Sequence, residues 1–488
     1  MDLQVDATIE RHHADNPADI VDFDGPHDTE DPLNWSSRYK WSMVILISVL
    51  SLIVNLAILL CAPATSDILA EFNSTDKLSS TLLVSIWELG EVVGPLVVAP
   101  LSETYGRLPV YHTFNVLFIV FSIVAARSTS MSMLIAMRFF LGLSVASTVV
   151  NPCIVGDMFR EEHRGKALSI MGMIPFIAPV LGPSIGGVIS QAMGWRWTFW
   201  IVAIIAGPLQ LLFFGTFRET YRVRILQVKA RNLRKKTGNE RLRSTYEHDE
   251  GDVAPLAVIR KTLLRPLKLL VCSPVVMLVG IISGVGMSLV YVIITSLPEV
   301  YEDMYGFSKS TIGLTYWGVG TGMILSTLSV GHFVDWYLIH KTRLGNASSE
   351  CRLPPMILGS LLVPLGIMTF GWAVQYRLHW IAPIIFTGLV GFGYVSIAIS
   401  AWTYLVDAFG IYSASATAGT VLLRNAGAAC LPLAGPSLVG KINWGWGFSV
   451  LALVGLLTLP MSIVLMYAGQ RLRSSKAHRK LVPKGAQV

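Results

Sequence analysis

Residues 41–60 read WSMVILISVLSLIVNLAILL, a run of twenty residues without a charged side chain. A helix of about 20 apolar residues is long enough to cross the ~30 Å hydrocarbon core of a bilayer. Comparable runs begin near Ser79, Leu108, Met131, Gly165 and Arg196, and a second set begins near Leu269, Lys309, Pro354, His379, Ser413 and Trp446. The sequence therefore predicts an all-α membrane protein with twelve transmembrane helices in two bundles of six.

The composition of the whole chain agrees with a bilayer as its solvent. Of 488 residues, 53% are hydrophobic and 14% are charged, whereas soluble domains carry roughly 25% charged residues. The basic residues lie in loops between apolar runs and do not form the basic face that is typical of nucleic-acid binding. The five cysteines show no CxxC spacing, which argues against a zinc site or a disulfide framework. We therefore exclude a soluble enzyme and a nucleic-acid partner, and we expect no metal and no cofactor.

The alternation of apolar runs and polar segments divides the chain into five parts. We predict an N-terminal tail (1–40), a first six-helix bundle (41–216), a central loop (217–268), a second six-helix bundle (269–468) and a C-terminal tail (469–488). The N-terminal tail holds ten Asp or Glu residues and lacks the pattern of a cleavable signal peptide, so we expect the first membrane helix to act as the insertion signal.

The central loop is rich in Lys and Arg, and its pattern predicts a helix over 222–236. Two interpretations stay open for its charges. They belong to a solvated connector that fixes orientation, or they contact lipid head groups.

Basic residues also predict the orientation in the membrane, because cytoplasmic loops carry an excess of Lys and Arg. An even number of spans places both termini on one side. Of the 38 Lys and Arg residues, 30 fall in the tails and loops of that side, and six fall in the opposite loops. We therefore predict a multi-pass protein of the cell membrane with both termini in the cytoplasm.

The same topology selects one candidate glycosylation site. Asn73-Ser74-Thr75 is an acceptor motif in a loop predicted to be extracellular. The motifs at Asn34 and Asn346 fall on the cytoplasmic side, so we expect them to stay unmodified.

Corresponding positions of the two halves carry similar residues, which is typical of transporters built from repeats. In the first half, residues 100–103 (PLSE) end the second helix and residues 105–107 (YGR) follow it. In the second half, the second helix ends in residues 331–335 (GHFVD). The fifth and eleventh helices share a Gly-Pro pair, at residues 182–183 and 435–436.

Four residues at these corresponding positions are candidates for a cytoplasmic latch: Glu103, Gly106, Arg107 and Asp335. Glycine permits a tight turn, and Glu103 is placed to pair with a basic side chain or to cap a neighbouring helix N-terminus. Such contacts would hold helix ends together in one state and break when the bundles move. An ordinary charged turn is the alternative interpretation.

We single out five polar or charged residues inside apolar runs as candidates for function, because such groups are costly there unless they face a cavity or a partner. Glu88 and Glu91 are three apart and share one helix face, so a buried pair would be suited to proton exchange; alternatively, one or both lie in water at the interface. Arg138 is a candidate for tuning a carboxylate or holding an anionic part of the substrate, unless it only packs. Arg424 and Asn425 either pair within the bundle or contact substrate.

The fifth helix carries a stripe of small residues in the stretch PVLGPSIGG (179–187). Gly182, Gly186 and Gly187 let another helix approach closely, and Pro183 bends the helix. A hinge or a leak-proof seam is the functional interpretation, and helix packing alone is the alternative.

Catalytic signatures are missing from the sequence. Residues 435–441 match the pattern GxxxxGK, but Ile442 stands where Ser or Thr would bind magnesium. We therefore expect no enzymatic activity, and we expect an ion gradient, not ATP, to supply the energy.

Seven stretches carry a resemblance to a known family: DPLNW (31–35), APLSETYGR (99–107), RFFLG (138–142), GPSIGG (182–187), GWRWTFW (194–200), RETY (218–221) and YLVDAFG (404–410). With these motifs the chain, from about Asp31 to Tyr467, resembles the major facilitator superfamily, specifically its fungal twelve-helix drug:proton antiporter branch. It departs from the usual loop 2-3 motif, in which Ala99 and Thr104 replace a glycine and an arginine.

The resemblance implies alternating access between two bundles and export of a small, often hydrophobic compound against proton entry. It also implies that Arg138 belongs to proton coupling and that residues 182–187 form the antiport seam. Glu88 and Glu91 stand where mostly apolar residues are expected in this branch, which suggests a coupling or substrate feature particular to this chain.

We therefore predict a proton-driven exporter of a drug, toxin or secondary metabolite. Its expected partners are the small molecule, protons and membrane lipid, and we expect a monomer. One alternative is a proton-coupled importer of a small nutrient, against which the motif of the fifth helix argues. The other is a non-transporting receptor or scaffold, against which the short C-terminal tail argues.

Overall fold

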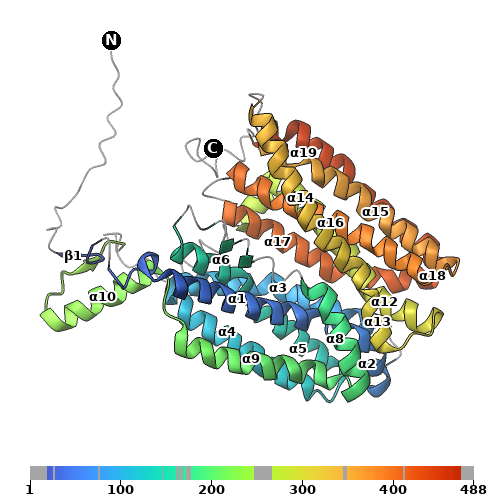
Figure 1. The fold of residues 1–488 in the computed structure, drawn as a ribbon, viewed down its shortest axis with the longest axis horizontal. Coiled ribbons are helices and arrows are strands. Elements are labelled where there is room, and N and C mark those ends of the chain that lie inside the picture. The colour runs from blue at the N-terminus through green and yellow to red at the C-terminus, as the bar shows by residue number, and fades with distance from the viewer. Residues whose placement is uncertain are drawn as a thin grey trace, which may run out of the picture.

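The computed structural model describes residues 19–25, 28–74, 77–145, 147–160, 164, 167–168, 170–171, 177–246, 266–343, 349–409 and 413–473. Within these residues, eight helical segments are long and apolar enough to cross a membrane. One of them, Lys441–Arg473, begins at a break in helical backbone angles at Ile442 and Asn443. Shorter helices complete the remaining crossings, so the described chain makes twelve passes, six in each bundle (Figure 1).

The first bundle contains the helices of the N-terminal half. Its members are α1 (Ser37–Leu59) continued by α2 (Thr65–Glu71), α3 (Lys77–Tyr105), α4 (Arg107–Ala126), α5 (Met131–Leu143) continued by α6 (Ser147–Met158), α8 (Ala178–Met193) and α9 (Arg196–Thr216). The predicted run near Gly165 begins outside the described residues.

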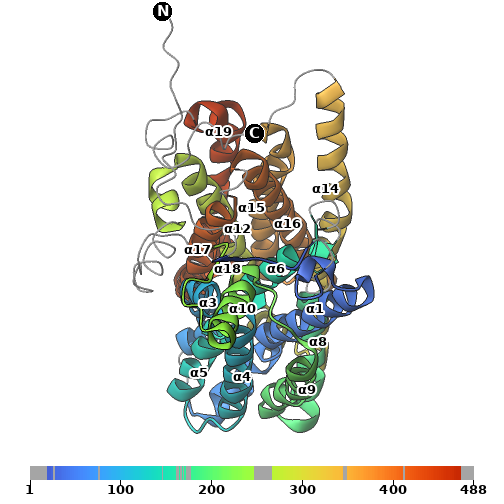
Figure 2. The same ribbon diagram turned by 90° about the vertical axis from the view of Figure 1, so that its left-hand side faces the viewer.

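The second bundle repeats this arrangement with the C-terminal half. Its members are α12 (Pro274–Glu299), α13 (Lys309–Thr315) continued by α14 (Trp317–Arg343), α15 (Pro354–Gln375), α16 (Ile381–Phe409), α17 (Ser413–Cys430) continued by the first turns of α18 (Ala434–Leu456), and the rest of α18 continued by α19 (Thr458–Arg473). The bundles lie as two layers, one above the other in Figure 2.

Several spans are broken, which the apolar runs did not predict. The first span passes from α1 through a short 3-10 turn, Ala62–Ala64, into α2. Pro63 lies in this turn and has no backbone N–H to donate, so the regular helix cannot continue through it. A π-turn at Val300–Met304 follows α12, and a second 3-10 turn, Leu431–Leu433, joins α17 to α18.

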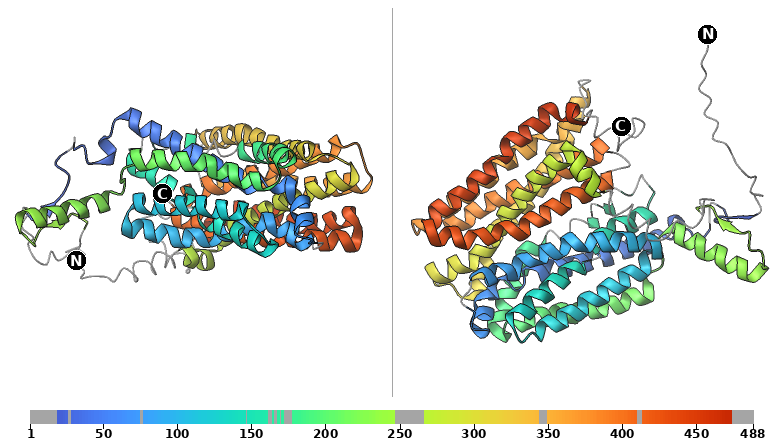
Figure 3. Two further views of the ribbon diagram at one scale, coloured as in Figure 1. Left: turned by 90° about the horizontal axis from the view of Figure 1, so that it is seen from below. Right: turned by 180° about the vertical axis from the view of Figure 1, so that it is seen from behind.

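The central loop contains the helix that its sequence predicts: α10 spans Arg222–Thr237. Its C-terminal neighbour β2 (Arg243–Ser244) pairs in parallel with β1 (Ile20–Val21) of the N-terminal tail. The tail therefore lies against the central loop, a contact that was not predicted, and this small unit extends away from the first bundle (Figure 3).

Ion pairs hold the tail on α10. Lys229 Nζ lies 2.9 Å from Asp24 Oδ2 and 3.4 Å from Asp28 Oδ2, and Arg222 Nη2 lies 3.2 Å from Asp31 Oδ2. Desolvation lowers the pKa of Lys229, but the hydrogen bonds and charges of the aspartates outweigh it and raise this pKa. The lysine therefore stays charged at neutral pH.

The two bundles share a core at one end of the molecule only. We call this the α13 end, because α13 and α2 lie there, and we call the opposite end, which carries α10, the α10 end (Figure 1). A large buried apolar cluster combines residues of both halves, including Leu60, Trp87, Tyr291 and Tyr316. A second cluster, which includes Val44 and Phe213, contains residues of the first bundle alone. The helices of the two bundles diverge toward the α10 end.

Candidate functional site

Close packing of α3 against α5 positions the first-bundle side of the site. A Cβ atom added to Gly142 would lie 2.2 Å from the carbonyl oxygen of Trp87, and one added to Gly90 would lie 2.3 Å from that of Phe139. Real Cβ atoms do not approach so closely, so only glycine allows the two backbones to touch here. The contact brings the part of α3 that carries both glutamates beside Arg138.

Arg138 is completely buried and is bound by backbone carbonyl groups. Its Nε donates to Leu83 O at 2.7 Å, Nη1 donates to Ala57 O at 2.9 Å, and Nη2 donates to Ile58 O at 2.7 Å. Ala57 and Ile58 lie where α1 ends, so the guanidinium satisfies carbonyl groups that the break in the first span leaves free. The guanidinium carbon also lies 4.8 Å from the ring centroid of Trp87, within cation–π range.

Close packing of α12 against α17 positions the second-bundle side. A Cβ added to Gly284 would lie 3.1 Å from Leu423 O, and one added to Gly427 would lie 2.7 Å from Ser288 Oγ. The two helices then present Tyr291, Arg424 and Asn425 to α3 of the first bundle.

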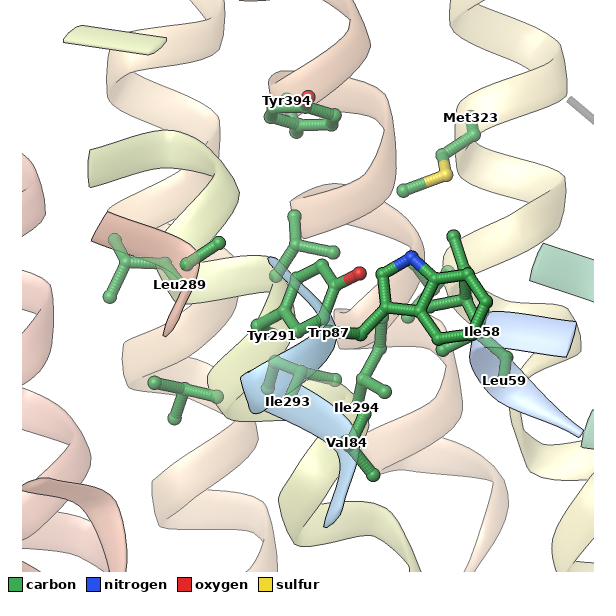
Figure 4. Packing of buried hydrophobic residues seen from close by; sticks show 14 of the residues in the cluster. Ile58, Leu59, Val84, Trp87, Leu289, Tyr291, Ile293, Ile294, Met323 and Tyr394 are labelled. Carbon is green, nitrogen blue, oxygen red and sulfur yellow. The ribbon is translucent and has the colours of Figure 1, made fainter. Parts of the chain in front are cut away.

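Both glutamates of α3 accept hydrogen bonds from the opposite bundle. The hydroxyl group of Tyr291 donates to Glu88 Oε1, and Asn425 Nδ2 donates to Glu91 Oε2 at 3.4 Å. Trp87 Nε1 donates to the other oxygen of Glu91 at 2.8 Å. Glu88 is 2% exposed, so it lies in the interior and not in water at a helix end. Figure 4 shows Trp87 of α3 beside Tyr291 of α12 in this interior.

Arg424 completes the cluster. Its Nε donates to Asn425 Oδ1 at 3.0 Å, so the amide of Asn425 links Arg424 to Glu91. Unlike Arg138, Arg424 is only half-buried. We call Glu88, Glu91, Arg138, Arg424 and Asn425, with Trp87 and Tyr291, the central polar cluster.

The structure thus brings together all five intramembrane polar residues that the sequence singled out. Trp87 and Tyr291 were missed. Trp87 is adjacent to Glu88 in the sequence, which is a usable signal. Tyr291 has no such signal, because a tyrosine in an apolar helix reads as ordinary packing.

The loop 2-3 motif is more compact than predicted. Glu103 lies in the last turn of α3, and Gly106, with φ of +99°, alone separates α3 from α4. Glu219 caps α4: its Oε1 accepts from Arg107 N at 2.9 Å and its Oε2 accepts from Leu108 N at 3.1 Å. A carboxylate at this position satisfies free N–H groups and complements the helix dipole. Glu219, which belongs to the RETY stretch, was missed as a site residue.

The side chain of Arg107 is surrounded by polar and aromatic side chains. Its Nη1 donates to Ser102 Oγ at 2.7 Å, its Nε lies 3.5 Å from Asp157 Oδ2, and its guanidinium carbon lies 4.6 Å from the ring centroid of Tyr221. Thr220 Oγ1 donates to the same Asp157 oxygen at 3.3 Å. These contacts join the ends of α3 and α6 and the segment after α9, all within the first bundle.

The second bundle has a related arrangement. Arg352 Nε donates to Asp407 Oδ2 at 2.8 Å, and Arg473 Nη2 donates to Glu350 Oε1 at 2.6 Å. The arginine–aspartate pair joins the start of the third span of this half to the end of the fourth, as in the first bundle. The side chain of Asp335, predicted as part of the latch, lies outside the described residues.

The small residues of α8 bring it into contact with α1 of its own bundle. A Cβ added to Gly186 would lie 2.0 Å from Leu60 O, and one added to Gly182 would lie 3.4 Å from Leu56 O. The first of these positions therefore admits only glycine without a shift of backbone.

The other face of α8 contacts the second bundle. A Cβ added to Gly187 would lie 2.3 Å from Lys309 O, and one added to Gly313 would lie 2.4 Å from Pro183 O. Ser184 Oγ also accepts from Trp317 Nε1 at 2.9 Å. The predicted stripe therefore lies at a backbone-to-backbone seam between the bundles.

Polar contacts reinforce this seam at the α13 end. Lys309 of α13 forms an ion pair with Asp67 of α2, and Ser310 N donates to Gln191 Oε1 at 3.1 Å. Each contact joins one bundle to the other. Asn73 of the acceptor motif also lies at this end, after α2, and its side chain is exposed.

Metal ligands do not gather in the parts of the chain that the structure describes: no three His, Cys, Asp or Glu side chains are close enough to bind an ion together. All five cysteines lie in described parts of the chain and form no disulfide, and Cys61 and Cys351 are buried.

Comparison with known proteins agrees with this architecture. The sequence model of the Major Facilitator Superfamily matches residues 43–423. The efflux pump radE of Floropilus chiversii is 38% identical over 472 residues, which cover 96% of this chain and 87% of that protein. The MFS transporter prlG of a fungal species (strain NRRL 50135) is 41% identical over 461 residues, which cover 93% of this chain and 96% of that protein.

Solved structures show the same fold at low sequence identity. A D-xylose–proton symporter matches with a TM-score of 0.66 and 16% identity, over 88% of this chain and 97% of its own. A bacterial homologue of the human lysosomal transporter Spinster, in an inward-facing conformation, matches with a TM-score of 0.63 and 12% identity, over 92% of this chain and 99% of its own. With twelve spans in two bundles and a family match across most of its length, this chain belongs to the major facilitator superfamily.

Proposed function

We propose that this protein is a proton-driven efflux transporter that exports a small organic compound, such as a drug, toxin or secondary metabolite. The observation that carries the proposal is the central polar cluster, in which two interior glutamates of one bundle accept hydrogen bonds from the other bundle. A relative named as an efflux pump covers nearly the whole chain, which supports the direction of transport.

The arrangement of the bundles supports alternating access. The seam of α8 closes the α13 end by backbone contact, while the helices diverge toward the α10 end (Figure 1). Export requires the opposite state as well, in which the seam opens and the helix ends at the α10 end meet. Proton binding and release within this glutamate pair would drive the exchange between the two states, because both carboxyl groups bond across the moving interface.

The charge count supports the orientation of this cycle. We assign the α10 end and both termini to the cytoplasm and the α13 end to the outside of the cell membrane. In the state described here, the transported compound then enters between the bundles from the cytoplasm. Asn73 would be accessible to glycosylation on the outer side, the latch residues would act on the cytoplasmic side, and the protein would work as a monomer surrounded by lipid.

Export can be tested in a host that lacks its own exporters. Cells that express the full chain are challenged with a panel of hydrophobic drugs and fungal metabolites, and survival and intracellular accumulation are measured with and without a protonophore. We expect lower accumulation of one compound class, reversed by the protonophore. Higher accumulation of a compound in expressing cells would instead indicate an importer.

The role of the glutamates is tested in the same assay. The double variant Glu88→Gln with Glu91→Gln should reach the membrane and lose gradient-dependent export. Asp303→Asn, which changes an exposed carboxylate at the α13 end, serves as the matched control and should export normally. Normal export by the double variant would remove the pair from the mechanism.

A further inference from the structure

We propose that the two glutamates have different roles: Glu88 carries the exchanged proton, Glu91 stays ionised, and Tyr291 is the positioning residue through which the second bundle contacts the protonated group. This inference rests on the proposed function for its meaning in transport, but its observations and its test concern the side chains alone.

Glu91 has the hydrogen bonds that an ionised carboxylate needs. Each of its two oxygens accepts a bond from a nitrogen: Oε1 from Trp87 at 2.8 Å and Oε2 from Asn425 at 3.4 Å. An indole N–H is a donor only, so it cannot accept a hydrogen bond from a protonated carboxyl oxygen. Asn425 in turn receives a hydrogen bond from the Arg424 guanidinium, which places a cation one residue away from the carboxylate.

Glu88 has the surroundings of a neutral carboxylic acid. Only its Oε1 accepts a hydrogen bond, from the Tyr291 hydroxyl, while its buried Oε2 has no partner among the described residues. A buried carboxylate oxygen without a donor is costly. A proton on Oε2 removes the charge, and Oε1 then accepts from Tyr291 as an ordinary carbonyl oxygen.

The charged and titratable groups around Glu88 are consistent with this assignment. Glu91 faces it from its own helix, Arg138 from α5, Tyr291 from α12, Tyr394 from α16 and Arg424 from α17. Among the described residues, neither arginine donates a hydrogen bond to Glu88. Three of the five N–H groups of Arg138 donate to backbone carbonyl groups, and Arg424 Nε donates to Asn425 Oδ1.

Tyr291 connects this proton to the movement of the bundles. Its hydroxyl is the one hydrogen-bond partner of Glu88 among the described residues, and it belongs to the opposite bundle. When the bundles separate at this level, Glu88 loses that partner. Loss or gain of the proton at Glu88 therefore changes a contact across the moving interface, whereas Glu91 keeps the Trp87 bond within its own helix in either state.

Infrared spectroscopy of the purified full-length protein in lipid vesicles tests the assignment without a substrate. A protonated carboxyl group has a C=O stretching band that is separate from the bands of ionised carboxylates. We compare Glu88→Gln with Glu91→Gln, the same change three residues apart on one helix. A band from a buried protonated carboxyl group, which resists exchange into heavy water, should disappear in Glu88→Gln and persist in Glu91→Gln.

Tyr291→Phe supplies the second measurement. Without the hydroxyl donor, the C=O band of Glu88 should move to higher frequency, because a carbonyl that accepts no hydrogen bond has a stiffer C=O bond. Tyr316→Phe is the matched control: it removes another buried hydroxyl group, which donates to Ile294 O at 2.9 Å within the second bundle. The band should not move in this control.

The outcomes separate this inference from the proposed function. A band that disappears in Glu91→Gln, that persists in both variants, or that is absent from the unmodified protein overturns the assignment even if export is demonstrated in cells. A band that follows the expected pattern confirms the assignment even if no compound in the export panel is transported, in which case it is the proposed function that fails.

Discussion

At the scale of single residues, the two intramembrane arginines have different surroundings although they look alike in sequence. Arg138 donates from three nitrogens to three backbone carbonyl groups and has no exposed surface. Arg424 bonds to side chains, with its Nε donating to Asn425 Oδ1, and is half-buried. The guanidinium group of Arg138 thus completes the hydrogen bonds of a broken helix, while Arg424 lies at the interface between the bundles.

Arg138→Lys should destabilise the fold strongly. A lysine ammonium on a flexible stem cannot reproduce the planar fork of arginine, so at least one of the three carbonyl groups loses its donor. Each buried polar group left without a partner costs about 1–3 kcal/mol. We expect a clear fall in melting temperature of the purified protein, measured by differential scanning fluorimetry.

The control for this change is Arg127→Lys, which alters an exposed arginine at the end of α4 and should leave the melting temperature unchanged. An Arg138→Lys protein that melts normally would contradict a mainly structural role. If it also fails to export, the role of Arg138 in proton coupling, which the family resemblance implies, would be the better explanation.

At the scale of elements, glycines decide which helices touch. The contacts of α3 with α5, of α12 with α17 and of α8 with both α1 and α13 are so close that an added methyl group would meet the neighbouring backbone or side chain. Small residues allow such contact in membrane proteins, where the gain comes from van der Waals packing and not from expulsion of water. These contacts set the places from which the central polar cluster is built.

Gly186→Ala should disturb the contact of α8 with the end of α1. The new Cβ would lie 2.0 Å from Leu60 O, and overpacking of this kind typically costs about 1–3 kcal/mol. We expect a lower melting temperature and reduced export. Gly215→Ala in α9 is the matched control, since nothing lies within 4 Å of its added Cβ, and it should be neutral or slightly stabilising. Equal behaviour of the two variants would show that α8 adjusts its position freely.

At the scale of the whole molecule, the bundles meet at one end and diverge at the other. The contacts between them at the α13 end include the Lys309–Asp67 ion pair, the bond from Ser310 to Gln191 and the backbone seam of α8. Each must break if the molecule is to open toward that end. The tail and α10 form a separate unit next to the first bundle.

Reversal of one charge at the α13 end should favour the state that opens there. In Asp67→Lys, the new lysine faces Lys309, and like charges repel. In the double variant Asp67→Lys with Lys309→Asp, opposite charges meet again. We expect export to fall in the single variant and to recover in the double variant.

Opening is measured with an added cysteine in the seam, Ser184→Cys, labelled by a membrane-impermeant thiol reagent. The background is the labelling of the protein that lacks Ser184→Cys. After this background is subtracted, labelling should rise in the Asp67→Lys variant and should fall in the double variant to the level seen with the original ion pair. Equal labelling in all three proteins would show that this ion pair does not hold the outer end closed.

Much of this protein follows from local patterns in its sequence. Runs of about twenty apolar residues predicted the spans, and α5, α9, α13, α15 and α17 begin at the residues where those runs were expected to start. The helix α10 was predicted to within one residue at its end. Four charged residues inside apolar runs, with Asn425 beside Arg424, identified five of the seven members of the central polar cluster. These signals are local, because the bilayer demands apolar side chains and internally satisfied backbone over a fixed length.

Other features were decided only by the tertiary structure. Tyr291 bonds to Glu88 from a helix about two hundred residues away in the chain, Glu219 caps α4 from beyond α9, and the N-terminal tail pairs with β2. Neither the hydrophobic periodicity nor the spacing of residues in the sequence predicts such contacts, since each contact depends on how two distant elements approach each other. The sequence by itself therefore determined the number of spans, their order and the buried charges, because hydrophobicity is read residue by residue. The partner of each charge was decided by packing, because a hydrogen bond needs two groups whose positions the whole fold sets.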